Sequence, residues 1–447
     1  MRPPYRGIFG IKLLTVHSST SPTFQPLQSA SSPRPTIGSC PSQPLMPGEG
    51  ASSPASEPAM QAKYDDLARG YRQAGKPLAL TEDEMDASLA KLESSLSGLS
   101  SADLGPRSEP PPALDGPTTA EIGEWSFDQI HSVPYDALPS LGYAFLMAHD
   151  EISSSKIDKT KLWHFICEVA ARYHARPFHN FRHAVDVLLA ASALLKMVRK
   201  NHSSLGDDPT LVGALLVGAI VHDVDHPGLM NGYLKATGHG LAAEGYAPTA
   251  HDEKYGSGFR EDFVDASAIG ILERHHAAMA VTLLDRPELD FLSSHPERSK
   301  FVSYMREFVL ATDVSTTMAA VKALDALVAE GESGGGDAPA QQPDAPQVMR
   351  LLIKAADISN PTRPLPVYEQ WVDQVMAEFF RQGDAEKGRG LPFSMNCDRE
   401  TVKVNGCQVG FITFLVGPLY KALARYAPEL QVCVDQMEKN LKHYKGE

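Results

Sequence analysis

The chain has 447 residues, of which 43% are hydrophobic and 21% charged, and its formal net charge is −14. An acidic chain without clustered Lys and Arg is a poor nucleic-acid binder. Its longest apolar run, residues 211–221, is shorter than the roughly 20 residues that cross a bilayer, so we expect no integral membrane segment. The five cysteines are scattered and lack CxxC spacing. This excludes a disulfide framework or zinc finger and favours a reducing compartment such as the cytoplasm.

The N-terminal part of the chain changes character three times. Residues 1–58 contain 11 Pro and 11 Ser, a composition that predicts a disordered tail. Residues 1–48 are basic and free of acid, so an organelle transit peptide is the alternative. Residues 59–97 have apolar side chains three to four positions apart, which predicts a helical arm that could form a homodimer. Residues 98–120 are again rich in Ser, Pro and Gly and are expected to be a linker.

From residue 121 to residue 447 the pattern is mostly helical, which predicts one large all-α domain. Apolar residues recur at spacings of three and four, and alternating runs typical of strands are few. The clearest expected helices are residues 161–173, 181–198, 211–222, 301–327 and 371–382. A Gly- and Pro-rich segment, residues 331–347, is expected to be a surface loop.

Histidines and carboxylates gather in three segments of this domain: 179–186 (HNFRHAVD), 222–226 (HDVDH) and 352–361 (LIKAADISNP). If the first segment opens a helix, His179 and His183 lie one turn apart on one face. The second segment ends an apolar helix, where buried titratable groups need partners or a metal. A lone HxxxH or His-Asp pair is more often chance than a site. All three together, in this order, favour a metal centre.

Four of these residues, His183, His222, Asp223 and Asp357, offer two imidazoles and two carboxylates. Such a set suits zinc or another first-row divalent ion. A bridging carboxylate could hold a second ion, for which Mg²⁺ or Mn²⁺ is suited. A hydroxide between two such ions is a strong nucleophile for phosphorus. We therefore expect two divalent cations, Zn and Mg (or Mn).

In these motifs the sequence resembles the class I cyclic-nucleotide phosphodiesterases. Further matching segments are residues 272–276 (LERHH), 311–313 (ATD), Trp371 and residues 408–411 (QVGF). The resemblance covers roughly residues 125–447 and says nothing about residues 1–120. It implies a compact all-α catalytic domain that hydrolyses the 3′ ester of cAMP or cGMP to the 5′-monophosphate.

The resemblance also implies roles for individual residues. His183, His222, Asp223 and Asp357 would be metal ligands, with Asp223 bridging. His179 would be the general acid that protonates O3′. Two more residues are expected to be catalytic beside His179: Glu273, which would orient His179, and His226. Residues expected to hold the ligands and metal-bound waters are Asp186, Asp225, His226, Asn231 and His276.

The purine pocket is implied by the resemblance alone. Gln408 matches the family's glutamine that hydrogen-bonds the purine edge, and Phe411 and Val375 match the two sides of an apolar clamp. Asn360 and Tyr368 match positions that line the pocket. The segment around Asn360 and Tyr368 favours cAMP over cGMP, although residues 178–181 and 391–392 also occur in a cGMP-selective member.

The sequence departs from the family pattern in four places, one of which is three extra residues between Asp265 and Leu272. Phe178 stands where Tyr is usual, Val314 and Thr317 replace a usual Met and His, and residues 243–264 form an insertion. None of these changes removes an expected metal ligand. Two other functions share part of the pattern: an HD-type nucleotide phosphohydrolase would lack Gln408 and Phe411, and a non-catalytic nucleotide-binding regulator would have a broken metal set.

Overall fold

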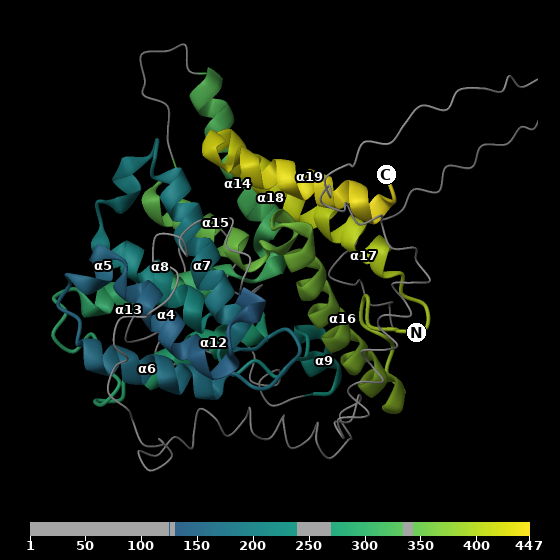
Figure 1. Ribbon diagram of the computed structural model, residues 1–447, viewed down its shortest axis with the longest axis horizontal. Coiled ribbons are helices and arrows are strands. Elements are labelled where there is room, and N and C mark those ends of the chain that lie inside the picture. The colour runs from purple at the N-terminus through teal and green to yellow at the C-terminus, as the bar shows by residue number, and fades with distance from the viewer. Residues whose placement is uncertain (1–124, 126–129, 239–269, 334–342) are drawn as a thin grey trace, which may run out of the picture. The chain divides into compact units, whose positions relative to one another are not determined.

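The computed structural model describes residue 125 and residues 130–238, 270–333 and 343–447 (Figure 1). These residues form helices and no β-strand, which confirms the predicted all-α class. The predicted tail (1–58), arm (59–97), linker (98–120) and insertion (243–264) lie outside the described residues. The predictions for those segments therefore stay predictions.

The described helices, in chain order, are η2 (Ile130–Ser132), η3 (Tyr135–Ala137), α4 (Leu138–Met147), α5 (Asp150–Ser153), α6 (Lys159–Arg172), α7 (Phe181–Val198), η4 (Ser203–Gly206), α8 (Pro209–Val221), α9 (Asn231–Ala236), α12 (Ile271–Leu284), α13 (Arg298–Ala311), η6 (Val314–Thr316), α14 (Thr317–Ser333), α15 (Ala345–Asp357), η7 (Asn360–Thr362), α16 (Leu365–Gly388), α17 (Val404–Phe411), η8 (Ile412–Val416), α18 (Gly417–Tyr426), η9 (Pro428–Leu430) and α19 (Gln431–Lys445). Helix η8 is a π-helix, and the other η elements are 3₁₀-helices.

Helix α8 is the most deeply buried element, and α7, α13 and α15 pack against it. Asp208 begins the helix by accepting hydrogen bonds from the backbone N–H groups of Thr210 and Leu211, at 3.0 and 3.2 Å. Gly213 allows close packing, because a Cβ there would lie 2.9 Å from the Phe301 ring. The apolar body of α8 ends directly at His222 and Asp223, which places both in the interior.

Some expected helix boundaries were wrong. Residues 301–327 are not one helix, because Asp313 ends α13 by accepting hydrogen bonds from the backbone N–H of Ser315 (2.8 Å) and Gly270 (2.7 Å). The expected loop 331–347 is shorter, since α14 reaches Ser333 and α15 begins at Ala345. The expected helix 181–198 is confirmed at both ends, and residues 371–382 lie within the longer α16.

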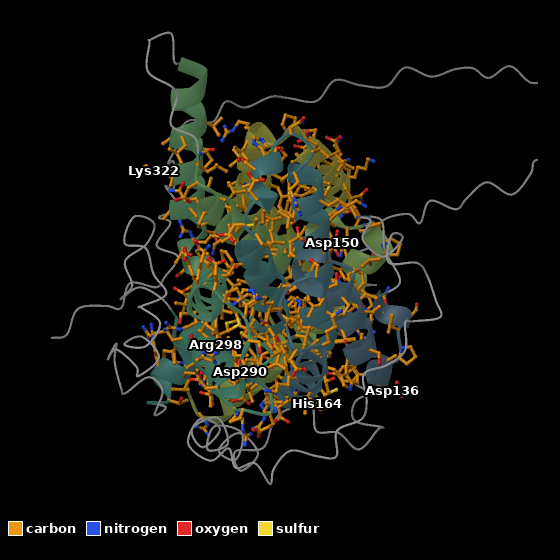
Figure 2. The ribbon with its side chains drawn as sticks, turned by 90° about the vertical axis from the view of Figure 1, so that its left-hand side faces the viewer. Asp136, Asp150, His164, Asp290, Arg298 and Lys322 are labelled. Carbon is orange, nitrogen blue, oxygen red and sulfur yellow. The ribbon has the colours of Figure 1, made fainter. Side chains whose placement is uncertain are left out.

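Figure 2 labels two partly exposed residues of opposite charge, Asp290 and Arg298. Arg298 at the start of α13 forms ion pairs with Asp290 at 3.1 Å and with Asp285 at 2.9 Å. These contacts join α13 to the segment that follows α12. Exposed pairs of this kind contribute roughly 0–1 kcal/mol each, so burial of the apolar faces is the main source of stability.

The stretch Val404–Tyr426, which joins α17, η8 and α18, is long and apolar enough to cross a membrane by length and composition. Polar residues interrupt this stretch, so it is not one continuous apolar run. Half of its most apolar window is buried inside the domain, and core helices pass the same test. The expected absence of a membrane segment stays a prediction.

Candidate active site

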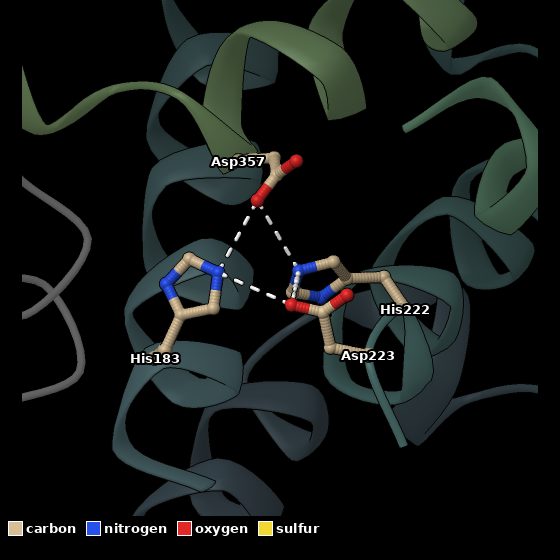
Figure 3. A group of neighbouring side chains, drawn as sticks. All are labelled: His183, His222, Asp223 and Asp357. Carbon is tan, nitrogen blue, oxygen red and sulfur yellow. Dashed lines mark hydrogen bonds and ion pairs between the residues drawn. The ribbon is translucent and has the colours of Figure 1, made fainter. Parts of the chain in front are cut away.

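Four side chains that are far apart in the sequence converge at one point (Figure 3). His183 comes from α7, His222 and Asp223 from the turn after α8, and Asp357 from the last residue of α15. His183 Nε2 lies 3.2 Å from Asp357 Oδ1 and 3.6 Å from Asp223 Oδ2. His222 Nε2 lies 3.1 Å from Asp223 Oδ2 and 3.3 Å from Asp357 Oδ1. The prediction that these four side chains lie together is confirmed.

The hydrogen bonding of His222 fits a metal ligand. Its Nδ1 donates to the carbonyl of Ala219 at 2.8 Å, which leaves the Nε2 lone pair facing Asp223 and Asp357. Nε2 is buried and has no partner with hydrogen-bond geometry. A divalent cation would satisfy this nitrogen and both carboxylates. The donor set, two imidazole nitrogens and two carboxylate oxygens, therefore fits zinc or a similar ion.

Electrostatics supports the same assignment. Burial lowers the pKa of His222, but Asp223 and Asp357 outweigh it and raise that pKa well above the usual value. Burial raises the pKa of Asp357, but the neighbouring imidazoles of His183 and His222 bring it down to about 2. A buried pair of carboxylates thus attracts positive charge at this point. A cation that binds here would displace the proton on His222.

A second group of side chains, Asp223, His226 and His276, shares Asp223 with the first. His276 Nδ1 donates to the carbonyl of Val224 at 2.7 Å, and its buried Nε2 lies 3.7 Å from Asp223 Oδ1 without a hydrogen-bond partner. His226 Nδ1 accepts from the backbone N–H of Gly228 at 3.0 Å, so the neutral ring carries its proton on Nε2. Asp223 is therefore the side chain that the two groups share.

His179 lies just before the helix that carries His183, so the two do not share one helix face as they would if segment 179–186 opened a helix. Helix α7 begins at Phe181, because the Asn180 side chain accepts from the backbone N–H of Arg182 at 2.9 Å and caps it. His179 still faces the cluster, with Nε2 3.9 Å from Asp223 Oδ2. Its ring stacks on that of His226 at a centroid distance of 3.8 Å.

The carboxylate that holds His179 is Glu378 on α16, not Glu273. Glu378 Oε1 accepts a hydrogen bond from His179 Nδ1, and Oε2 accepts from the backbone N–H groups of Phe178 (3.1 Å) and His179 (3.2 Å). Burial lowers the pKa of His179, but the charge and hydrogen bond of Glu378 raise it to about 9. The imidazole is therefore protonated near neutral pH.

The predicted role of Glu273 as the residue that orients His179 is thus wrong. Its Oε2 accepts from Asn231 Nδ2 at 3.0 Å, while Asn231 Oδ1 accepts from the backbone N–H of Leu272 at 2.9 Å. Burial and the nearby Asp313 raise the pKa of Glu273 to about 7. Glu273 and Asn231 therefore form a separate contact that joins α12 to α9.

The two remaining aspartates of the motifs have buried cationic or imidazole partners. Asp186 Oδ1 accepts from Arg363 Nη2 at 2.9 Å. Asp225 contacts the Nε2 atoms of His174 and His275 at 2.8 and 2.9 Å, and its backbone adopts a left-handed φ of 67°. The two contacts of Asp225 fix the turn that carries Asp223. Sequence reasoning missed His174, His275 and Arg363.

The residues expected to bind the base lie on three elements. Gln408 and Phe411 are on α17, Tyr368 and Val375 on α16, and Asn360 begins η7. The Tyr368 hydroxyl donates to Gln408 Oε1 at 2.7 Å, and both side chains are buried. Phe411 and Val375 are partly buried at the edge of the apolar core. The structure therefore joins α16 and α17 through the glutamine that sequence analysis singled out.

Comparison with known proteins agrees with this geometry. The model of the 3′5′-cyclic nucleotide phosphodiesterase family matches residues 178–248 and 265–437. The unmatched residues between these segments fall within the insertion 243–264.

Named relatives and solved structures agree as well. A probable 3′,5′-cyclic-AMP phosphodiesterase, pde-4 of Caenorhabditis elegans, is 33% identical over 74% of this chain and 45% of its own length. The 3′,5′-cyclic-AMP phosphodiesterase 4C of Rattus norvegicus is 32% identical over 69% of this chain and 54% of its own. The chain thus spans about half the length of these relatives.

The structure of LmjPDEB1 in complex with IBMX superposes with a TM-score of 0.61 at 25% identity, covering 82% of this chain and 98% of that one. The phosphodiesterase domain of the RhoPDE fusion protein from Salpingoeca rosetta shares the fold, with a TM-score of 0.60 at 23% identity over 72% of this chain and 94% of that one. The family match, together with the His and Asp cluster, shows that this chain belongs to the 3′5′-cyclic nucleotide phosphodiesterase family.

Proposed function

We propose that this protein hydrolyses the P–O3′ ester bond of a 3′,5′-cyclic nucleotide and releases the nucleoside 5′-monophosphate. One observation carries the proposal. A cluster able to hold a divalent cation faces a protonated imidazole, His179, whose far side is fixed by Glu378. The relatives' names support the same reaction.

The chain supplies the proton that the leaving group needs. Water adds to phosphorus and loses a proton, the P–O3′ bond breaks, and O3′ gains a proton. Glu378 occupies Nδ1 of His179, so the transferable proton is on Nε2, the atom nearest the cluster. A pKa of about 9 keeps that proton in place before the bond breaks. His179 is thus the proposed general acid.

The proposed cofactors are two divalent cations, with Zn at His183, His222, Asp223 and Asp357. The second, Mg or Mn, would share Asp223. A divalent cation bound there would polarise the phosphoryl oxygens and lower the pKa of water. His226 and His276 present one ring N–H and one lone pair beside Asp223, which suits them to orient water at that position.

The proposed substrate is cAMP in preference to cGMP. Tyr368 uses one lone pair of Gln408 Oε1, which leaves the second lone pair and two N–H groups for the ligand. An adenine edge, with an amino donor beside a ring acceptor, matches this set. The names of the relatives favour cAMP, although a rotated amide could also pair with guanine.

Cyclic nucleotide is the proposed small-molecule partner, and nucleic acid is not a proposed partner. The arm of residues 59–97 is the proposed homodimer contact, and the cytoplasm is the proposed location. Size-exclusion chromatography of the chain with and without residues 59–97 tests the dimer.

The deciding experiment is hydrolysis of cAMP and cGMP by the purified full chain. The chain is first stripped with a chelator and then reloaded with Zn²⁺ and Mg²⁺ or Mn²⁺. We expect 5′-AMP only after reloading, with a higher kcat/KM for cAMP than for cGMP. Hydrolysis restricted to non-cyclic nucleotides would instead indicate an HD-type phosphohydrolase, and binding without turnover would indicate a regulator.

A further inference from the structure

A short turn joins the metal cluster to the base pocket. Helix η7 begins at Asn360, three residues after Asp357, and α16 then carries Tyr368. Its internal hydrogen bonds are short-range, from Thr362 N to Ser359 O at 2.8 Å and from Arg363 N to Asn360 O at 3.1 Å. A single 3₁₀ turn has little stability of its own. Its position therefore depends on what holds it from outside.

Side chains from both ends of the domain hold the carbonyl groups of this turn. Asn440 on α19 donates through Nδ2 to Pro361 O at 2.7 Å and to Arg363 O at 2.8 Å. Trp125 donates through Nε1 to Thr362 O at 3.3 Å. Three consecutive carbonyls thus accept from two residues that lie outside every motif identified in the sequence.

The Arg363 side chain adds a link from the turn to the metal-ligand helix. Its guanidinium lies over the Trp125 ring at 4.5 Å, and Nη1 donates to the Trp125 carbonyl at 3.0 Å. Nη2 donates to Asp186 on α7, one turn beyond His183. Arg363 and Asp186 are each about 1% exposed. The Trp125 ring therefore packs against one partner of a buried ion pair.

We infer that Trp125 and Asn440 are positioning residues: they fix the 360–363 turn and so align the base pocket with the metal cluster. The inference rests on the proposed function for its kinetic consequence. Neither residue reaches the reacting atoms. Loss of either contact should displace Asn360 and the start of α16 while the four-residue cluster persists.

The test compares Trp125→Ala, Trp125→Phe and Asn440→Ala with a matched control, Trp163→Phe. Trp163 lies on α6, is buried, and packs edge-on against Tyr143 away from the turn. Trp125→Phe keeps a ring under Arg363 but removes the N–H donor. We expect Trp125→Ala to raise KM for cAMP roughly tenfold, with a smaller rise for Trp125→Phe. The purine-free substrate bis(p-nitrophenyl) phosphate should change less than about twofold, and Trp163→Phe should leave the ratio of the two substrates unchanged.

Amide hydrogen exchange gives a readout that does not depend on catalysis. The backbone N–H groups of Thr362 and Arg363 should exchange at least tenfold faster in Trp125→Ala and Asn440→Ala than in the wild type. Their exchange rates should not change in Trp163→Phe. Unchanged exchange, or equal losses on both substrates, would overturn the inference. If the wild type hydrolyses neither cyclic nucleotide but the two variants still exchange faster than the wild type, the proposed function is overturned. The role of Trp125 and Asn440 in fixing the turn then stands.

Discussion

The proposed metal cluster and the proposed base pocket are built in different ways. The cluster takes charged side chains from helix ends next to the buried α8, each within a short polar motif. The pocket takes mostly neutral side chains from α16 and α17, joined by contacts between distant residues such as Tyr368 and Gln408. Buried charge needs partners, so it leaves a local signal in the sequence. A pocket of neutral side chains is specified by packing between distant residues, so it leaves little local signal in the sequence.

The strongest way to separate the two regions is to remove a cluster residue. Asp357→Ala should abolish hydrolysis of both cAMP and bis(p-nitrophenyl) phosphate, because the site loses one of two carboxylates that hold the cation. Bound zinc, measured by mass spectrometry, should fall in parallel. The control is Asp325→Ala, which removes an exposed carboxylate paired with Arg425. Full activity with full metal content in Asp357→Ala would contradict the ligand assignment.

His179→Ala should reduce kcat for cAMP by about 10²–10⁴ with little change in bound metal, as expected for loss of a general acid. A substrate with a better leaving group at O3′ needs less help from an acid and should lose less. Steady-state kinetics on the two substrates checks this. Equal losses, or loss of zinc, would mean that His179 is a ligand or a structural residue.

Glu378→Gln should reduce kcat about 10- to 100-fold at neutral pH and change the pH profile. In the wild type, Glu378 raises the pKa of His179 to about 9, so the protonated acid is lost, and kcat falls, as pH rises through about 9. Without that charge the pKa of His179 is lower, so the fall in kcat begins at lower pH. An alkaline limb that does not move would show that another group controls it.

Gln408→Ala tests the pocket alone. Loss of hydrogen bonds to the base in a buried site costs about 1–2 kcal/mol, which corresponds to roughly 5- to 30-fold in kcat/KM for cAMP. Activity on bis(p-nitrophenyl) phosphate should persist, since it has no purine. Gln431→Ala, on the exposed side of α19, is the control. A parallel loss on both substrates would place Gln408 among the residues that support the fold.

Deletion of residues 1–118 should have the smallest effect, because it spares both regions and keeps Trp125. We expect a folded domain with kcat/KM for cAMP within tenfold of the full chain, equivalent to about 1.4 kcal/mol. Circular dichroism and kinetics check this. A larger change would show that the predicted arm, residues 59–97, completes the catalytic domain.

Sequence reasoning recovered the helical class and the convergence of His183, His222, Asp223 and Asp357, because the motifs flank apolar helices. It left open whether His179 and His183 share one helix face, since spacing alone does not show that Asn180 caps the helix. It also missed Glu378, which is 199 residues from His179 in the chain. Glu378 does lie seven residues after Trp371 and three after Val375, on the same face of a predicted helix. This shared face was the only indication in the sequence that Glu378 points toward the site. Only the packing of the helices shows that it contacts His179.

The break at Asp313 has the same explanation. Residues 301–327 keep helical periodicity, so the pattern does not reveal where α13 ends. The end is set by the backbone N–H of Gly270, a residue 43 positions away, which binds the Asp313 carboxylate. Tertiary hydrogen bonds of this kind override local propensity.

The two ends of the domain meet at the 360–363 turn, and this has a consequence for biosynthesis. Asn440 follows every metal motif in the chain, so the ribosome adds it after those motifs. A nascent chain can therefore assemble the cluster before the turn acquires its last contact. Nonsense changes near the C-terminus that remove Asn440 should yield protein that keeps most of its helix content and metal yet binds substrate poorly. The final turns of α19 thus complete a turn whose neighbouring metal motifs are synthesised first.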